Sequence, residues 1–237
     1  MNLLSPFQPE TAPIRTVSLP EFHSDIYVMD VTSVSVSDNL DWLAPERREK
    51  LLRYRRPEDR QLLIGADYLL LCALSKMPEF AGKSSEDLRH AAVRSVDSYG
   101  KPFLSRYPGI RFNLSHSGCH AACAIGPDPL GIDIQIRQPG FEDLIDSVCT
   151  PEETKRLHSV SNAARMTCFY DIWSLKESYV KALGRGFSLN PRSVSTTCRS
   201  DTRYSVASSE TTTVCDALLL PDTVPGYSLA VCVRPCK

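Results

Sequence analysis

One short stretch near the middle of the chain, LGIDIQI at residues 130–136, alternates between apolar and polar side chains. Its isoleucines recur at every second position, and Asp133 and Gln135 stand between them. Because successive side chains of a strand point to opposite faces, this period predicts a strand whose isoleucine face packs on a core. The opposite face carries a carboxylate and an amide about 6.5–7 Å apart, the rise of two residues. A half-buried strand with a solvated polar face fits the same pattern.

A second segment, further along the chain, has the period of a helix. Its apolar residues predict a buried stripe made of Cys168, Ile172, Leu175, Tyr179 and Ala182. Glu177 and Lys181 lie one turn apart on roughly the opposite side, which is also typical of an ordinary surface pair. Trp173 beside them indicates a cleft or an interface. If this helix meets the strand, Asp133, Gln135 and Glu177 would form a site for Mg²⁺ and a diphosphate, because Mg²⁺ prefers oxygen ligands.

Prolines and capping residues delimit the other predicted helices. Thr150, with Glu153 three positions later, forms a capping-box pattern that opens a helix. Gly184 is a favoured residue just after a helix end, and Pro45 and Pro57 suit first helical turns. The predicted helices are residues 45–53, 57–76, 151–157 and 169–183.

The predicted strands fall in both halves of the chain. They are residues 25–36, 112–125 (two strands around a turn at 117–118), 130–136, and two or more strands within 204–233. Residues 1–24 are predicted to be a loose lead-in, and residues 99–102 a turn. Prolines on both sides of Asp128 predict a connector between the two halves of the chain. We therefore expect an α+β chain of two similar lobes, an N-terminal lobe of residues 1–127 and a C-terminal lobe of residues 128–237.

Composition limits the class of protein. The 237 residues are 42% hydrophobic and 23% charged, with a net charge of −1, so a general nucleic-acid binder is not expected. We find no apolar run long enough for a membrane helix, and the N-terminal residues lack the features of a secretory signal. Nine cysteines without CxxC spacing indicate buried, reduced thiols in a cytoplasmic protein.

Two further segments carry groups that suit phosphate. The step Ser115-His116 offers a hydroxyl, an imidazole and backbone donors. The run from Glu46 to Arg56 is rich in arginine and is a natural docking place for a phosphorylated ligand, although such runs are often solvated helix faces. Lys101, on its Gly-Lys-Pro turn, adds one more cation.

A zinc site is a competing interpretation of the region after Ser115. Its four candidate ligands are His116, Cys119, His120 and Cys123. Their spacing is not a recognised zinc pattern, and a strand would divide these side chains between two faces. A His–Cys nucleophile pair is equally weak, because no nearby carboxylate would orient the histidine.

Five segments, taken together and in this order, resemble the 4′-phosphopantetheinyl transferases of the type that activates surfactin synthetase. They are Pro45–Lys50, Tyr99–Pro102, Phe112–Ser117, Gly131–Gln135 and Trp173–Lys181, followed by Gly184-Arg185-Gly186. The resemblance extends from about Trp42 to the C-terminal strands.

The resemblance implies a fold and a reaction. The family has a pseudo-twofold pair of α/β lobes, with coenzyme A held in the cleft between them. A serine hydroxyl of an apo carrier protein attacks the β-phosphate of coenzyme A, the 4′-phosphopantetheine arm moves to that serine, and adenosine 3′,5′-bisphosphate leaves. The reaction depends on Mg²⁺, for which Mn²⁺ can substitute, and the partners are acyl, peptidyl or aryl carrier proteins. We expect a monomer.

The resemblance also implies roles for single residues. Asp133 and Glu177 would be metal ligands, with Gln135 at a position where the family commonly has glutamate. Lys181 would meet the diphosphate, and we expect Glu177 to help take the serine proton. The expected contacts of coenzyme A are Arg47 and Lys50 at the nucleotide end and Lys101, Ser115 and His116 at the phosphates.

Some features depart from this pattern or leave alternatives open. Leu62 stands where a basic residue often contacts the nucleotide, with Arg60 two positions earlier as a substitute. Glu153 is a second candidate for the serine base, and residues 184–188 are a candidate surface for the carrier protein. A non-catalytic module that binds coenzyme A or carrier proteins remains an alternative, as does a Mg²⁺-dependent phosphohydrolase. An assay of mass gain on an apo carrier protein separates these alternatives.

Overall fold

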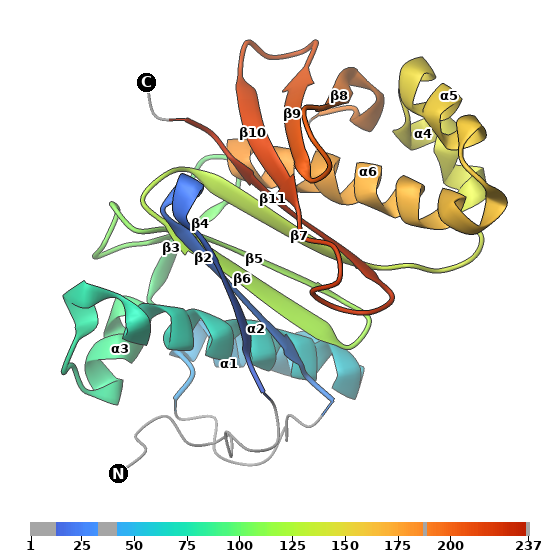
Figure 1. Cartoon of the computed structure of the whole chain (residues 1–237). Coiled ribbons are helices and arrows are strands. Elements are labelled where there is room, and N and C mark those ends of the chain that lie inside the picture. The colour runs from blue at the N-terminus through green and yellow to red at the C-terminus, as the bar shows by residue number, and fades with distance from the viewer. Residues whose placement is uncertain (1–12, 33–41, 187–188, 236–237) are drawn as a thin grey trace. The chain divides into compact units, whose positions relative to one another are not determined.

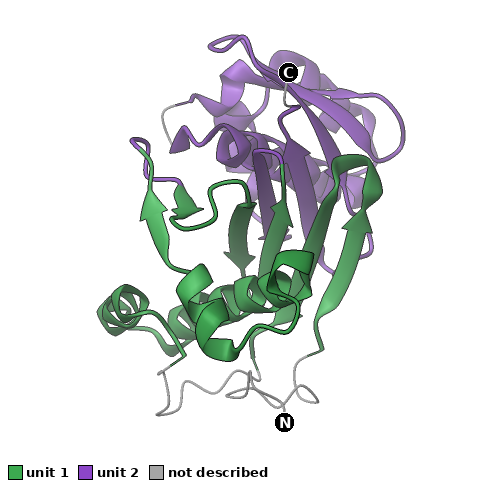
Figure 2. Cartoon of the chain, turned by 90° about the vertical axis from the view of Figure 1, so that its left-hand side faces the viewer, with its two compact units in different colours: residues 1–97, 102–127 green, residues 98–101, 128–237 purple. Residues whose placement is uncertain are grey.

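The structure is a computed structural model that describes residues 13–32, 42–186 and 189–235. The described residues form two compact units, one within residues 1–97 and 102–127 and the other within residues 98–101 and 128–237. Figure 2 colours the two units separately. Within the described ranges, no helix is both long enough and apolar enough to cross a bilayer.

The first unit combines a four-stranded antiparallel sheet with one long helix (Figure 1). Its strands are β1 (Arg15–Leu19), β2 (Ser24–Asp30), β5 (Arg111–Ser117) and β6 (His120–Gly126), in the order β1-β2-β6-β5. Its helices are α1 (Pro45–Arg53), α2 (Pro57–Lys76) and α3 (Ser85–Ala91), and a separate pair of strands is β3 (Arg94–Val96) and β4 (Pro102–Leu104).

Helix α2 supplies most of the apolar core of this unit, because thirteen consecutive residues from Leu62 to Leu74 are buried. Its buried side chains pack on one face of the sheet, which carries Ala121, Cys123 and Ile125 of β6. At Gly65 the helix lies so close to Val31 that an added Cβ would be 2.4 Å from the Val31 side chain.

The second unit has the same kind of build, a five-stranded antiparallel sheet with one long helix (Figure 1). Its strands are β7 (Leu130–Ile136), β8 (Val194–Cys198), β9 (Arg203–Ser208), β10 (Val214–Leu219) and β11 (Tyr227–Val233), in the order β7-β11-β10-β9-β8. Its helices are α4 (Ile145–Val148), α5 (Pro151–Ser159) and α6 (Asn162–Leu183). Leu175, Tyr179 and Ala182 of α6 pack on Ala230 and Cys232 of β11.

The α+β class and the likeness of the two halves are confirmed. Helices α1 and α2 and strand β7 have the predicted bounds, and Thr150 and Glu153 form both hydrogen bonds of a capping box. Gly184 ends α6 in the left-handed conformation, with φ 72°. Among the described residues, eight cysteines are free thiols, and five of these are buried.

Other predictions of local structure were incomplete. The expected lead-in contains β1, and α6 begins at Asn162 rather than Phe169, because Ser161 caps it with a hydrogen bond from the Ala164 amide. Strand β2 ends at Asp30, and residues 33–36 of the predicted strand lie outside the described residues. The sequence patterns also missed five short elements, α3, α4, β3, β4 and β8.

Candidate active site

The polar face of β7 is turned toward α6, so it is not a solvated surface. Gly131 lies on the same face as Asp133, and an added Cβ there would lie 2.1 Å from the Ser178 carbonyl oxygen and 2.4 Å from the Ala182 nitrogen. The absence of a side chain at Gly131 therefore allows the strand and the helix to lie in direct contact. As a result, Asp133 is only 5% exposed.

Asp133 forms an ion pair with Lys181. The Lys181 Nζ lies 2.7 Å from Asp133 Oδ1 and donates a second hydrogen bond to the Ile132 carbonyl oxygen at 3.1 Å. The lysine thus contacts the strand, and it forms a partly buried ion pair between two elements rather than the ordinary surface pair with Glu177 that the sequence left as an alternative.

Glu177 shares this environment. Burial raises the pKa of Glu177, the negative charge of Asp133 raises it further, and the Lys181 ammonium opposes the change. The structure thus brings together Asp133, Glu177 and Lys181. Gln135 lies two residues after Asp133 on the same face of β7 and is half-buried.

Lys101 holds the end of α6 to the start of β7. Its Nζ donates hydrogen bonds to the carbonyl oxygens of Leu130 at 3.0 Å, Lys181 at 2.6 Å and Ala182 at 3.0 Å. These bonds are as many as an ammonium group has protons. In this arrangement Lys101 therefore supports the backbone around the site, whereas the sequence predicted that it binds phosphate.

Glu153, the second candidate for the serine base, belongs to a buried structural network. Its Oε2 lies 2.7 Å from the Lys176 Nζ, and its Oε1 accepts hydrogen bonds from the Thr196 amide and hydroxyl. Lys176 also donates to the carbonyl oxygens of Val148 and Pro191. Burial lowers the pKa of Lys176, and the negative charge of Glu153 opposes that change. Both oxygens of Glu153 are thus committed to holding α5, α6 and β8 together.

Trp173 packs within the second unit, against a buried cluster that includes Phe141, Phe169 and Tyr170. These contacts explain why a tryptophan lies on the side of α6 opposite the predicted apolar stripe. The candidate carrier-protein surface at 184–188 is described only as far as Gly186, because Phe187 and Ser188 lie outside the described residues.

In the first unit, Asp67 organises the basic residues. This aspartate is 4% exposed, and its Oδ2 accepts a hydrogen bond from Arg47 Nε at 2.8 Å. Its Oδ1 pairs with Arg94 of β3, whose guanidinium also lies over the Phe112 ring, 5.3 Å from the centroid. Burial lowers the pKa of Lys50, and the positive charge of nearby Arg47 lowers it further. Arg47, Arg89, Arg94 and Trp42 line a small hollow beside this cluster.

The sequence reasoning missed Asp67 and Arg94. A signal was present for the first of them, since Asp67 interrupts an otherwise apolar helix segment, LLIGADYLLL. An acid at such a position needs a cationic partner. No feature of the sequence indicated that Arg94 would pair with Asp67. Arg94 lies in a short strand after a short helix, and neither element was predicted.

The two phosphate candidates of β5 point in different directions. Ser115 is 5% exposed, whereas His116 is exposed, as expected for neighbours in a strand. The turn between β5 and β6 consists only of Gly118 and Cys119, so Ser115 and His116 lie in the strand and not in a loop. Leu62 is buried in the core of the first unit, and the Arg60 Nε donates to the Tyr54 carbonyl oxygen.

Two carboxylates with an adjacent ammonium can hold a hard divalent cation and a diphosphate. Phosphoryl transfer requires such groups, because they neutralise the charge on the phosphate oxygens. Comparison with known proteins leads to the same chemistry. The family model described as the 4′-phosphopantetheinyl transferase superfamily matches residues 129–232, which contain Asp133, Glu177 and Lys181.

Curated relatives match more of the chain. The chain is 32% identical over 212 residues to 4′-phosphopantetheinyl transferase ffp of Bacillus subtilis, a match that covers 89% of this chain and 91% of the relative. It is 30% identical over 193 residues to 4′-phosphopantetheinyl transferase Sfp of Bacillus subtilis strain 168, covering 81% and 83%. A third relative, of Xenopus laevis, is named L-aminoadipate-semialdehyde dehydrogenase-phosphopantetheinyl transferase and is 40% identical over 105 residues, 38% of this chain and 35% of its own. This chain belongs to the 4′-phosphopantetheinyl transferases.

Proposed function

We propose that this transferase works with Mg²⁺ and that Asp133 and Glu177 hold the ion. The enzyme moves the 4′-phosphopantetheine arm of coenzyme A to a serine of an apo carrier protein and releases adenosine 3′,5′-bisphosphate. The observation that carries the proposal is the mutual approach of Asp133, Glu177 and Lys181, in which both burial and the charge of Asp133 raise the pKa of Glu177.

The donor set at this place fits a hard cation. Asp133 and Glu177 supply carboxylate oxygens, and Gln135 supplies a neutral amide oxygen on the same face of β7. Mg²⁺ prefers oxygen ligands and is commonly held by one or two carboxylates together with substrate phosphates. When bound, it supplies positive charge that neutralises the oxygens of the diphosphate.

Lys181 contributes a fixed positive charge. Its ammonium pairs with Asp133, and in our proposal it also faces the diphosphate and stabilises the charge that develops on the leaving group. Glu177 is the candidate base for the serine proton.

Further residues contact coenzyme A in this proposal. Arg47 and Lys50 of α1 hold the nucleotide end, supported by the Asp67 cluster. Ser115 and His116 contribute contacts to phosphate. Lys101 positions the site indirectly. Its hydrogen bonds to backbone carbonyl groups fix the end of α6 and thereby the position of Lys181 relative to β7.

The partner we propose is an acidic helix of an apo carrier protein, and we propose that the transferase acts as a monomer in the cytoplasm. The free and mostly buried thiols among the described residues support a reducing compartment. A monomer is sufficient because the proposed ligands of the metal and of coenzyme A all come from one chain.

The test is transfer to an apo carrier protein, followed as the gain in mass of the carrier with coenzyme A and Mg²⁺. We expect the wild-type protein to convert the carrier, and chelation with EDTA to stop the reaction until Mg²⁺ is restored. Asp133→Ala should lower the rate by about 10³-fold or more, because a metal site contributes several kcal/mol and each 1.4 kcal/mol is a factor of ten.

A matched control is Asp216→Ala, which removes an exposed aspartate from β10 of the same sheet and should leave the rate unchanged. Gln135→Glu should preserve the reaction and shift its Mg²⁺ requirement, since it adds a charge to the donor set. Full activity of a folded Asp133→Ala protein would overturn the metal assignment, and an unchanged Mg²⁺ titration of Gln135→Glu would remove Gln135 from it.

A further inference from the structure

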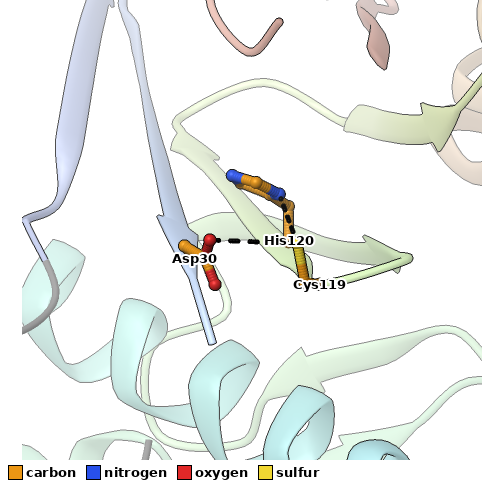
Figure 3. Close-up of side chains that lie close together, drawn as sticks. All are labelled: Asp30, Cys119 and His120. Carbon is orange, nitrogen blue, oxygen red and sulfur yellow. Dashed lines mark hydrogen bonds between the residues drawn. The ribbon is translucent and has the colours of Figure 1, made fainter. Parts of the chain in front are cut away.

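Three side chains of the first unit, from the end of β2 and the turn before β6, converge at one end of its sheet. Asp30, the last residue of β2, lies directly opposite His120, the first residue of β6, in the antiparallel register. Cys119 precedes His120 and occupies the two-residue turn from β5. Figure 3 shows the three side chains pointing toward one another, and all three are partly exposed.

The distances between their donor atoms are short. Cys119 Sγ lies 3.3 Å from His120 Nδ1 and 3.8 Å from Asp30 Oδ2, and one ligand atom of each residue lies within 4.8 Å of the others. A tetrahedral ion with bonds of about 2.0–2.3 Å keeps its ligand atoms about 3.3–3.8 Å apart. Both distances from the sulfur fall in this range.

The turn explains how two neighbouring residues can face the same point. Within a regular strand, Cys119 and His120 would project to opposite faces. Gly118 has φ +56°, as the first position of a tight hairpin turn requires, and Cys119 therefore lies in the turn and not in the strand. The Val31 amide donates a hydrogen bond of 2.8 Å to the Cys119 carbonyl oxygen, which fixes the turn beside the end of β2.

Asp30 is also oriented by its own neighbours. Its Oδ1 accepts hydrogen bonds from the Thr32 amide at 2.8 Å and the Thr32 hydroxyl at 2.7 Å, whereas its Oδ2 faces Cys119. Partners that hold the second oxygen of a carboxylate in this way are typical supports of metal ligands.

We propose that Asp30, Cys119 and His120 form a zinc site, made of other residues and suited to another metal than the Mg²⁺ ligands of β7 and α6. A thiolate, an imidazole and a carboxylate are the ligand types that Zn²⁺ takes, and three protein ligands leave a fourth position for water. Mg²⁺ does not suit this set, because it requires oxygen ligands.

This set differs from the zinc interpretation of the sequence. That interpretation included His116 and Cys123 and lacked Asp30, which is 89 residues from Cys119 in the chain. Cys123 is fully buried in the core, on the face of β6 that packs on α2, so it does not reach the end of the sheet where the other three side chains lie. The strand register supplies a ligand that sequence spacing could not reveal.

Zinc binding is tested by titrating the full-length protein with Zn²⁺ in the presence of excess Mg²⁺, with a chromogenic chelator as competitor. We expect one zinc per chain. Cys119→Ser and His120→Gln should each weaken that binding by about 100-fold or more, and Thr32→Ala by about 10-fold, the lower end of the effect of losing a partner of a ligand. Cys198→Ser, at an exposed cysteine of β8, is the matched control and should bind zinc like the wild type.

A second measurement uses only the wild-type protein. Zn²⁺ should protect Cys119 from alkylation by iodoacetamide, read by peptide mass, while Cys198 reacts at the same rate with and without zinc. Binding that is equally tight in Cys119→Ser would overturn the proposal, and so would alkylation of Cys119 at an unchanged rate in saturating Zn²⁺.

Discussion

Gly131 is the position where a single methyl group is expected to disturb both the packing and the site. In Gly131→Ala, the new Cβ would lie 2.1 Å from the Ser178 carbonyl oxygen, 2.4 Å from the Ala182 nitrogen and 2.8 Å from the Lys181 Cβ. A normal contact between carbon and carbonyl oxygen is about 3.3 Å. Helix α6 must therefore move away from β7 by about 1.2 Å, because two of the three obstacles are backbone atoms that cannot rotate away.

The expected cost follows from that displacement. Forcing one extra methyl into a packed interior costs about 1–3 kcal/mol, and we expect the upper end of that range for Gly131→Ala. The same movement separates Glu177 of α6 from Asp133 of β7. Since a misplacement of about 1 Å can lower a catalytic rate by about 10²-fold, the transfer rate should fall more than the loss of stability alone would suggest.

The assays are urea unfolding, which gives the change in unfolding free energy from the shift in midpoint, and transfer to an apo carrier protein at a temperature where the variant is folded. Gly109→Ala is the matched control, because a Cβ there meets no atom within 4 Å. If Gly131→Ala unfolds at the same urea concentration as Gly109→Ala and retains full activity, the argument that glycine permits the contact of β7 with α6 is refuted.

Three further predictions concern other contacts. Lys176→Met should lower the unfolding free energy by about 3–5 kcal/mol, because it leaves the buried Glu153 carboxylate without its cation, and a urea midpoint equal to that of the wild type would contradict this. Lys101→Met should cost about 2–3 kcal/mol in the same experiment, since hydrogen bonds from a charged donor to carbonyl groups are lost; a variant with unchanged stability but a raised KM for coenzyme A would instead assign the ammonium to phosphate. Ser84→Ala should cost about 1 kcal/mol, because it removes the cap of α3, with the Ser75→Ala protein as a comparison at a mid-chain serine that caps no helix start.

The sequence predicted those parts of the fold in which local signals agree with tertiary packing. Strand β7 was predicted with its observed bounds because its isoleucines recur at every second position, although both of its faces are buried from Leu130 to Ile134, and α2 because Pro57 fixes its start. The start of α6 was misplaced because Ser161 is a capping residue that no apolar stripe follows directly. Strand β1 was missed because its side chains are mostly exposed, so its pairing with β2 leaves little apolar period.

The sequence predicted that β7 and α6 meet, but it did not predict the contacts between them. Asp133, Glu177 and Lys181 come together as expected, but the partner of Lys181 is Asp133, a residue 48 positions away. Spacing along one helix favours Glu177 as that partner, and only the close approach of β7 at Gly131 changes the choice. Lys101 likewise bonds to backbone carbonyls, which have no signature in a sequence.

The buried carboxylate of Asp67 lowers the entropy that the basic cluster of the first unit loses when it binds an anion. An arginine on an open surface has about 2 kcal/mol of rotamer entropy to lose when it is immobilised on a ligand. Arg47 and Arg94 are already restrained by Asp67 when the protein folds, so the ordering cost is met before any anion arrives. Two guanidinium groups facing one carboxylate also leave an excess positive charge, so any anion that binds at this cluster meets preorganised cationic groups.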